Sequence, residues 1–514
     1  MNDWQAGYTA ETAYTFGYYT ELNPLRAQFL LLCSGIRPPE VATACELGFG
    51  QGVTVNIHAA ASGTRWHGND FNPAQTAFAR ELADVAGAGA ALSEESFEDF
   101  CRRSDLPEFD YIGLHGIWSW ISPENQHIIV DFLSRKLKPG GVLYVSYNTP
   151  AGWAAMAPVR ELLVQHNRIM SAPGQDRLVR VRQALAFVDQ MMALKPRYLQ
   201  ANPTVTQRLA QFAAMDTNYL AHEFFNTYWA PVAFSTIAPV LKLAKLEFAG
   251  PAPFVEHVHA LNLTPEQIDL LAGINDTTFR QLTRDFLLNQ QFRQDYWVKG
   301  ARRLSVYEQQ TGLRAVRVML LLPLSQISMT VTGAQGEATM DAAVYEPVLA
   351  ALAEQAICSI GELEQRLSGS VSDLGSLLQL LLVLLHKNCV SLVQSDDAIA
   401  QARPQADRLN RHLLEQALGR DDLQALASAV TGGGVFVRHL HQLFLLARLR
   451  GLSSPVQWTQ FAWQAYQAQQ RVLVDETGEA LLSEQENMAQ IQQHALHFEQ
   501  QILPILQALG VTAQ

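Results

Sequence analysis

A glycine-rich turn between an apolar run and a helix-forming run constrains this chain more than any other feature. Residues 41–45 read VATAC, residues 46–52 read ELGFGQG, and residues 53–61 favour a helix. The three glycines of the turn allow a sharp bend and a close approach of the backbone to a ligand. A strand, a glycine turn and a helix in this order place backbone N–H groups at the mouth of a pocket. The sequence therefore predicts an α/β fold whose first turn binds a nucleotide-like cofactor.

Two carboxylates flank this turn. Glu46 lies two residues before Gly48, where a carboxylate favours a cationic group and repels a pyrophosphate. The glycine spacing is GxGxG, whereas dinucleotide sites usually have GxGxxG. Asp70 ends a second predicted strand, residues 65–70, and lies twenty-two residues after Gly48, as one strand–helix–strand unit requires. A carboxylate there accepts both hydroxyls of a ribose; the alternative is an N-cap of the next helix, which is predicted to run to about residue 86.

Four segments resemble motifs of the class I S-adenosylmethionine-dependent methyltransferases. They stand in the family's order: ELGFGQG at 46–52, HGNDFNP at 67–73, FDYIGLHG at 109–116 and LKPGGVLYV at 137–145. The resemblance implies a Rossmann-like sheet of seven strands, the seventh antiparallel, and S-adenosyl-L-methionine as the cofactor.

Further segments are similar to a narrower group, the methyltransferases that carry a methyltransferase regulatory domain. The segments are YTFGYY at 14–19, HGIWSWISPEN at 115–125, SYNTPAGW at 146–153, YLAHEFFN at 219–226 and FRQDYWVKG at 292–300. The best understood members of this group are rickettsial-type lysine methyltransferases that modify a surface protein. The likeness covers about residues 8–305, and it implies that the acceptor is a lysine side chain of a protein.

The resemblance also assigns the residues that would hold the cofactor. The glycine turn would bind the amino acid tail, with Glu46 near its ammonium group, and Asp70 would hold the ribose. Ser96 would hydrogen-bond the exocyclic amine of the adenine, and Phe97 would stack on its ring. An equally good interpretation of Phe97 is an aromatic side chain of the core. The N-terminal tyrosines are either a flap over the cofactor or the packing of a terminal arm. The expected cofactor-binding set is Tyr14, Tyr19, Glu46, Gly48, Phe49, Gly50, Asp70, Phe71, Ser96, Phe97 and His115.

The acceptor is expected where the fourth and fifth strands end, because open α/β sheets bind ligands at the carboxyl ends of their strands. Methyl transfer is an in-line displacement that needs the reacting atoms about 3–3.5 Å apart. Aromatic faces stabilise a cation by roughly 0.5–2 kcal/mol, and a lysine with a pKa near about 10.4 must lose its proton before attack. The candidates that line this site or relay the proton are His115, Trp118, Tyr147, His222 and Glu223. The alternative for the last two is a pair on a solvated helix face.

Composition narrows the class of protein. The net charge of −12 over 514 residues argues against a nucleic-acid partner. Five cysteines without close spacing predict neither a metal site nor a disulfide framework, and they fit a reducing cytoplasm. The N-terminal sequence MNDWQAGY has neither the basic region nor the apolar core of a signal peptide. The leucine run at 377–385 is too short to span a bilayer.

The positions of these motifs and the length of the chain predict three domains. Residues 1–305 form the methyltransferase domain, with a helical cap or regulatory region inserted at about 156–240, before sixth and seventh strands at 245–249 and 295–299. A hairpin at 328–340, helices over 347–385 and a strand at 389–393 predict a winged-helix-like module at 306–400. Residues 401–514 are expected to form a helical C-terminal domain with a glycine break at 432–434.

The function expected from the sequence is S-adenosylmethionine-dependent methylation of a protein lysine. Two alternatives stay open. One is methylation of a small molecule or sugar, and the other is a catalytically silent methyltransferase-fold protein that acts in protein interaction. Association as a homodimer is a further open expectation.

Overall fold

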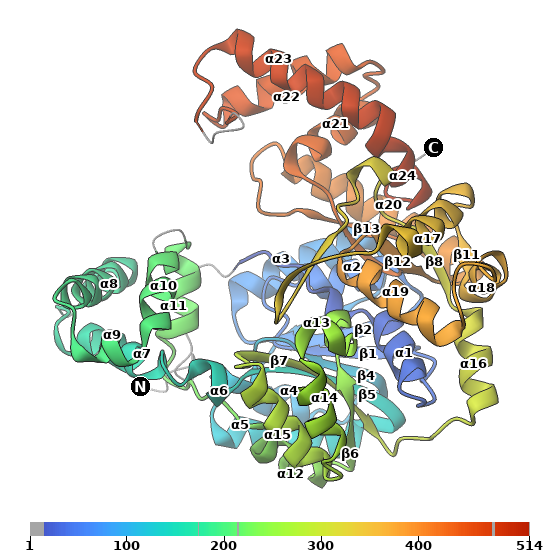
Figure 1. Ribbon diagram of the computed structural model, residues 1–514. Helices are drawn as coiled ribbons and strands as arrows, with labels where there is room; N and C mark the ends of the chain where they lie inside the picture. The colour runs from blue at the N-terminus through green and yellow to red at the C-terminus, as the bar shows by residue number, and fades with distance from the viewer. Residues whose placement is uncertain (1–14, 173, 213–214, 475–478, 513–514) are drawn as a thin grey trace.

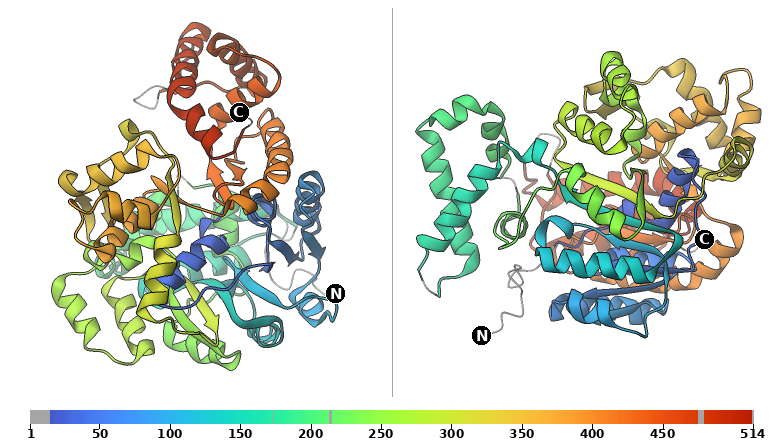
Figure 2. Two further views of the ribbon diagram at one scale, coloured as in Figure 1. Left: turned by 90° about the vertical axis from the view of Figure 1, so that its right-hand side faces the viewer. Right: turned by 90° about the horizontal axis from the view of Figure 1, so that it is seen from below.

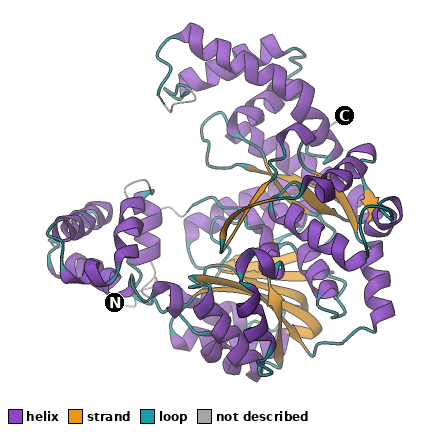
Figure 3. Ribbon diagram, viewed as in Figure 1, coloured by secondary structure: helices purple, strands orange, loops and turns teal. Residues whose placement is uncertain are grey.

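A seven-stranded mixed sheet forms the centre of the computed structural model, which describes residues 15–172, 174–212, 215–474 and 479–512 (Figures 1 and 3). The strand order is β3-β2-β1-β4-β5-β7-β6. The first five strands pair in parallel, and β7 runs antiparallel to β5 and β6. The predicted fold class is confirmed. The strands are β1 (Thr43–Leu47), β2 (Arg65–Asp70), β3 (Ala91–Glu94), β4 (Phe109–Leu114), β5 (Leu137–Asn148), β6 (Leu246–Pro251) and β7 (Phe292–Lys299).

Five helices cover the parallel half of the sheet. They are α1 (Pro24–Cys33), α2 (Val53–Ala61), α3 (Pro73–Ala86), α4 (Phe97–Arg102) and α5 (Pro123–Lys136). Polar side chains cap the first N–H groups of α1, α3, α4 and α5, as in α3, where Asn72 Oδ1 accepts from Ala74 N at 3.0 Å. The predicted helices at 53–61 and 73–86 are therefore confirmed.

The two faces of the sheet bury different side chains, because successive residues of a strand point to opposite sides. On β5, Tyr144 packs with Tyr111 and Trp66 in one apolar cluster, whereas Val145 and Tyr147 pack in the other. Along β5, whether a residue number is odd or even therefore decides which layer of the molecule its side chain enters.

A lobe of helices is inserted between β5 and β6, where a helical cap was expected. After α6 (Pro150–Trp153) the chain forms α7 (Ala157–Ile169), α8 (Arg177–Ala193), α9 (Arg197–Ala201), α10 (Pro203–Phe212) and α11 (Thr217–Phe224). We call α7–α11 the cap lobe. It has its own apolar core, around Leu163, Val181 and Leu209, and it stands off the sheet in Figure 1 and in the right-hand view of Figure 2.

The chain then returns to the sheet. The elements are α12 (Phe234–Leu243), η3 (Phe254–His257), α13 (His259–Asn262), α14 (Pro265–Ala272) and α15 (Thr277–Leu287). On the sheet, Phe234 stacks on Trp297 of β7 with ring centroids 5.4 Å apart. This packing anchors the region that precedes the antiparallel strand.

A small mixed region follows the sheet. It comprises α16 (Val306–Ala315), β8 (Arg317–Leu320), β9 (Thr330–Gly333), β10 (Gly336–Thr339), α17 (Ala342–Glu354), β11 (Cys358–Ser359), α18 (Ile360–Arg366), α19 (Leu374–His386) and β12 (Val390–Val393). The hairpin expected at 328–340 is β9–β10, and a separate antiparallel sheet has the order β11-β8-β12. Because β12 leads directly into a long helix, the winged-helix-like character of this module stays a prediction.

The C-terminal region packs against the helices of the central sheet. Its elements are α20 (Asp396–Gln416), β13 (Ala425–Ser428), β14 (Gly433–Phe436), α21 (His439–Leu449), α22 (Pro455–Ala468), α23 (Glu484–His497), η5 (Phe498–Ile502) and α24 (Leu503–Ala508). Leu409 of α20 shares an apolar cluster with Val53 of α2 and Leu82 of α3. The region was expected to be helical, but the glycine run at 432–434 opens the second strand of a short hairpin, β13–β14.

Within the described ranges, no helix is both long enough and apolar enough to cross a membrane. The same residues include no group of three or more His, Cys, Asp or Glu side chains that could hold a metal ion.

The close approach of α2 and α3 can be tested with a pair of glycine variants. Gly52 and Gly89 both have left-handed backbones, with φ of 69° and 71°, so a Cβ at either position adds about 1–2 kcal/mol of strain. A Cβ at Gly52 would also overlap Ala79 Cβ, whereas Gly89 has nothing within 4 Å. Gly52→Ala should therefore lower the free energy of unfolding in urea by about 1–3 kcal/mol more than Gly89→Ala. Equal losses in the two variants would contradict this packing.

Candidate functional site

The glycine turn between β1 and α2 is built from left-handed residues. Gly48, Gly50 and Gly52 have φ of 69°, 57° and 69°. The left-handed φ of Gly48 favours glycine, and a Cβ there would also require the end of the Ile117 side chain to shift. The N–H of Gly48 donates to the carbonyl of Asn69 at 2.9 Å, which holds the turn against the end of β2. The sharp turn expected from the sequence is confirmed.

Asp70 joins this turn to the end of β2. Its Oδ2 accepts from Gly50 N at 2.9 Å, and its Oδ1 accepts from Asn72 N at 2.9 Å. Burial raises the pKa of Asp70 to about 6, although the backbone N–H groups of Asn72 and Gly50 oppose the shift. The cap of α3 is Asn72, so the alternative reading of Asp70 as an N-cap is wrong. Each carboxylate oxygen has a second lone pair for a ligand hydroxyl.

Glu46 is buried beneath the turn with one oxygen unsatisfied. Within the described part of the chain, its Oε2 has no hydrogen-bond partner. Burial, with the nearby charge of Asp70, raises the pKa of Glu46 to about 8. A buried carboxylate without a partner is unfavourable until a cation or a donor reaches it. The site therefore has an unmet requirement for a positive group beside the glycine turn.

A first cavity, of about 210 Å³, opens at the carboxyl ends of β1, β2 and β4. It is lined by Gly48, Gly50, Asn69, Asp70, Phe71, Gln75, Ser96, Phe97, Glu98, His115, Gly116, Ile117, Trp120, Ile121, Ser122 and Asn125. Seven of the residues expected to hold the cofactor are among them: Gly48, Gly50, Asp70, Phe71, Ser96, Phe97 and His115. Neither Gln75 nor Asn125 was predicted from the sequence: Gln75 lies on α3 in no motif, and Asn125 lies on α5 at the end of the HGIWSWISPEN segment.

The other four expected cofactor residues lie elsewhere. Glu46 is buried beneath the turn and is not among the residues that line the cavity. Phe49 packs in the apolar core under the turn, and Tyr19 lines a neighbouring cavity. Tyr14 lies outside the described residues. Phe97 is only half buried, and the aromatic ring of α4 that enters the core is Phe100. Phe97 therefore lines the first cavity and is not a fully buried core residue.

A second cavity, of about 290 Å³, lies on the other side of the end of β4. It is lined by Tyr19, His115, Gly116, Trp120, Asn148, Tyr219, His222, Glu223, Gln291 and Phe292. Three residues line both cavities: His115, Gly116 and Trp120. The two cavities therefore adjoin each other at these residues, and together they lie in the size range of ligand sites.

His115 stands at this meeting point as a fixed, neutral ring. Burial lowers its pKa to about 4. Its Nδ1 lies 2.8 Å from the hydroxyl of Tyr144, which also accepts from Gln294 Nε2 at 3.0 Å. The ring of Tyr19 stacks on it, with centroids 3.7 Å apart and planes 25° apart. These contacts hold the ring in one orientation between the cavities.

Glu223 comes from α11 of the cap lobe and lines the second cavity. Burial raises its pKa to about 7, against the opposing effects of a hydrogen bond to Asn148 and the charges of Arg208 and Arg160. Its neighbour His222 is buried and lines the same cavity. The alternative that this pair lies on a solvated helix face is wrong, because α11 packs over the end of β5.

Two residues expected on the acceptor side face the opposite layer. Tyr147 is fully buried, and its hydroxyl donates to Asp295 Oδ2 at 2.7 Å. The alternation of β5 turns Tyr147 away from the second cavity and presents Asn148 instead. Trp118 begins the short turn η2 (Trp118–Trp120) and packs in the apolar core. The indole of this segment that lines both cavities is Trp120.

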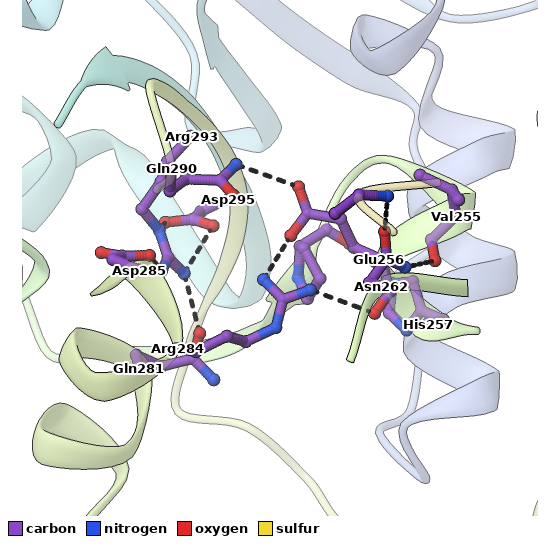
Figure 4. A network of polar contacts seen from close by, with 12 residues as sticks. Val255, Glu256, His257, Asn262, Gln281, Arg284, Asp285, Gln290, Arg293 and Asp295 are labelled. Atoms are coloured by element: carbon purple, nitrogen blue, oxygen red, sulfur yellow. Dashed lines mark hydrogen bonds and ion pairs between the residues drawn. The ribbon is translucent and has the colours of Figure 1, made fainter. Parts of the chain in front are cut away.

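A buried ionic network holds the corner between α15 and β7 (Figure 4). Arg293 Nη1 pairs with Asp285 Oδ1 at 2.6 Å, and its Nε pairs with Asp295 Oδ2 at 2.9 Å. At the same corner, the carbonyl of Gln290 accepts from Gly152 N at 2.7 Å. The next two residues, Gln291 and Phe292, are thereby held in the wall of the second cavity. They lie more than 140 residues from Asn148 in the sequence, so no local pattern could pair them.

Comparisons with known proteins agree with this architecture. Residues 216–299 match the family model described as the predicted methyltransferase regulatory domain. The chain is 35% identical over 99% of its length to the whole of the uncharacterized protein sll1526 of Synechocystis sp.. It is also 26% identical, over 55% of this chain and 51% of the relative, to the uncharacterized protein RP789 of Rickettsia prowazekii.

Among solved structures, PKMT2 from Rickettsia typhi, solved in complex with AdoHcy, matches with a TM-score of 0.70. The match covers 96% of this chain and 99% of that protein at 17% identity. The chain therefore belongs to the same family as the Synechocystis protein, with the fold of class I S-adenosylmethionine-dependent methyltransferases and a methyltransferase regulatory domain.

Proposed function

We propose that this chain methylates lysine side chains of a protein, with S-adenosyl-L-methionine in the first cavity and the lysine in the second. The observation that carries the proposal is the junction of the two cavities at His115, Gly116 and Trp120. An in-line displacement needs its two partners to meet at a single point from opposite sides. Two ligand spaces that share three residues provide this arrangement.

The residues around the first cavity fit the donor. The unsatisfied Glu46 Oε2 meets the ammonium of the amino acid tail, directly or through water, and the tail lies against the cradle formed by Gly48 and Gly50. Asp70 holds the ribose hydroxyls with the lone pairs that its backbone bonds leave open. Phe71 and Phe97 lie beside the adenine. When bound, S-adenosyl-L-methionine supplies the methyl group as a sulfonium-activated electrophile.

The second cavity suits an ammonium group on a slender chain. Its wall includes the aromatic side chains of Tyr19, Trp120, Tyr219 and Phe292. Aromatic faces attract a cation by roughly 0.5–2 kcal/mol, and the same apolar wall lowers the pKa of a lysine below its ordinary value of about 10.4. Glu223 takes the proton: one N–H bond of the ammonium breaks, and an O–H bond forms on the carboxylate. The amine is then neutral and nucleophilic.

Features of the cap lobe favour a protein over a small molecule. Residues 157–224 contain eight Arg or Lys and five Asp or Glu, within a chain of net charge −12. Large apolar side chains are exposed on the same lobe: Ile169 is 66%, Met170 69% and Leu194 82% exposed. Exposed apolar groups beside cations are typical of a surface that receives a protein partner. The partner that fits is an acidic protein surface bearing the target lysine.

The alternatives predict other outcomes. Methylation of a small molecule or sugar would not require a basic, apolar surface outside the cavity. A catalytically silent protein would require neither the buried carboxylate of Glu46, which has an unsatisfied oxygen, nor the carboxylate of Glu223, whose pKa is about 7. Both carboxylates favour the active enzyme.

Glu223→Gln should lower kcat for methyl transfer to poly-L-lysine by about 10²–10⁴-fold, because the amide cannot accept the proton. Affinity for S-adenosyl-L-methionine in calorimetric titration should stay within about twofold, since Glu223 does not line the first cavity. In the wild-type chain, kcat should rise with pH through about 7, because a base acts in its deprotonated form and burial raises this pKa from 4.5.

The matched control is Glu161→Gln, which changes an exposed carboxylate of the cap lobe and should leave the pH–rate profile unaltered. A Glu223→Gln enzyme with full kcat and an unshifted profile would remove Glu223 from the proton transfer.

Charge reversal on the cap lobe should separate a protein acceptor from a small one. Arg182→Glu with Arg197→Glu changes two exposed cations and should raise KM for an acidic protein such as serum albumin by about tenfold, because like charges then face each other. KM for Nα-acetyl-lysine amide should change less than about twofold. The control is Arg65→Glu with Lys242→Glu, an equal charge change at exposed positions outside the lobe. Equal effects on the two acceptors would contradict the docking role.

A further inference from the structure

The segment of residues 15–23, which we call the arm, touches the second cavity on one side and the C-terminal domain on the other. Its backbone is extended at Tyr19, with φ −113° and ψ 104°. Successive side chains of an extended segment point in opposite directions. Tyr19 accordingly stacks on His115 in the second cavity, while Tyr18 points toward the hairpin β13–β14.

Tyr18 is locked by contacts from two distant parts of the chain. Its hydroxyl accepts from Gly434 N at 2.6 Å and lies 3.0 Å from Nε2 of His58 on α2. Burial lowers the pKa of His58 to about 3, so its ring is a neutral partner for the hydroxyl proton. A Cβ on Gly434 would lie 2.8 Å from Tyr18 Cζ, so the hairpin backbone lies directly against the phenol ring.

Two further contacts join the arm to the C-terminal domain. The guanidinium of Arg420 lies 3.6 Å from the ring centroid of Phe16, which packs edge-on against Phe78 of α3. Asn23 Nδ2 donates to the carbonyl of Thr431 at 3.2 Å. Residues 420–434, which we call the clamp, therefore contact the arm at both ends and at its centre.

The arm is also fixed from beneath by the sheet domain. The N–H of Tyr19 donates to Thr54 Oγ1 at 3.1 Å, and the hydroxyl of Tyr296 on β7 donates to the carbonyl of Glu21. Tyr19 is therefore held in a backbone whose inner side bonds to α2 and β7, while its outer side bonds to the clamp. Loss of the outer contacts frees the backbone that sets the position of the Tyr19 ring.

We infer that the clamp positions Tyr19 against His115 and so sets the acceptor side of the site, which makes Tyr18 and Gly434 positioning residues. The inference rests on the proposed acceptor role of the second cavity. It gives the C-terminal domain a part in catalysis although none of the residues that line the two cavities comes from it. The first cavity should be insensitive to the clamp, since Tyr18 and Tyr19 are absent from its lining.

The test is Gly434→Ala in the full chain, with Gly419→Ala as the matched control. Gly419 belongs to the same domain, its φ is not left-handed, and the nearest atom to an added Cβ is Gln416 O at 3.9 Å. Gly434→Ala should raise amide hydrogen exchange in residues 15–23 by about tenfold or more and leave exchange in α2 unchanged. It should raise KM for poly-L-lysine by about tenfold and leave the calorimetric Kd for S-adenosyl-L-methionine within about twofold. Tyr18→Phe, which keeps the ring and loses both bonds, should give a smaller rise in each quantity.

Unchanged exchange in the arm of Gly434→Ala would overturn the inference, as would raised exchange with an unchanged KM for poly-L-lysine. If the wild-type chain methylates no lysine acceptor, the proposed function fails, while the exchange measurement still decides whether the clamp holds the arm.

Discussion

The hydrogen bond from Gly50 N–H to Asp70 is the contact on which the site depends. It joins the turn after β1 to the end of β2, and with the bonds to the carbonyl of Asn69 it fixes where the backbone of the turn faces the first cavity. The turn needs left-handed glycines, and the carboxylate must stand at the end of the neighbouring strand. One oxygen of Glu46, beneath the turn, then lacks a hydrogen-bond partner within the described part of the chain, and a cation or a hydrogen-bond donor of the ligand would satisfy it.

Local patterns predicted much of this architecture. The glycine turn, the helices at 53–61 and 73–86 and the acid that ends β2 follow from local spacing, and the resemblance to a known fold implied the seven-stranded sheet with an antiparallel seventh strand. The two-sided nature of β5 could not be predicted, because the side that Tyr147 faces depends on its register in the folded sheet. Its partner Asp295 lies 148 residues away in the sequence, so no window of sequence contains both.

The second cavity shows the same limit more clearly. Glu223 was a weak candidate because a His–Glu pair on a helix usually faces water, and only the packing of α11 over the end of β5 buries it. Phe292 precedes Arg293 of the buried network, and Tyr19 is held by Thr54 of α2 and follows Tyr18, which accepts from Gly434 of the C-terminal domain. The first cavity is thus lined by residues 48–125, whereas the second is lined by residues of the arm, the cap lobe and the regulatory domain as well.

The proposed reaction is a methyl transfer across the junction at His115 onto a protein lysine. The most direct test incubates the full chain and S-adenosyl-L-methionine labelled in its methyl group with the protein and small-molecule fractions of a cell extract. We expect the label to enter protein and to be recovered as methyl-lysine after acid hydrolysis, and we expect Asp70→Ala to abolish this labelling. Label found only in the small-molecule fraction, or in protein at residues other than lysine, would contradict it.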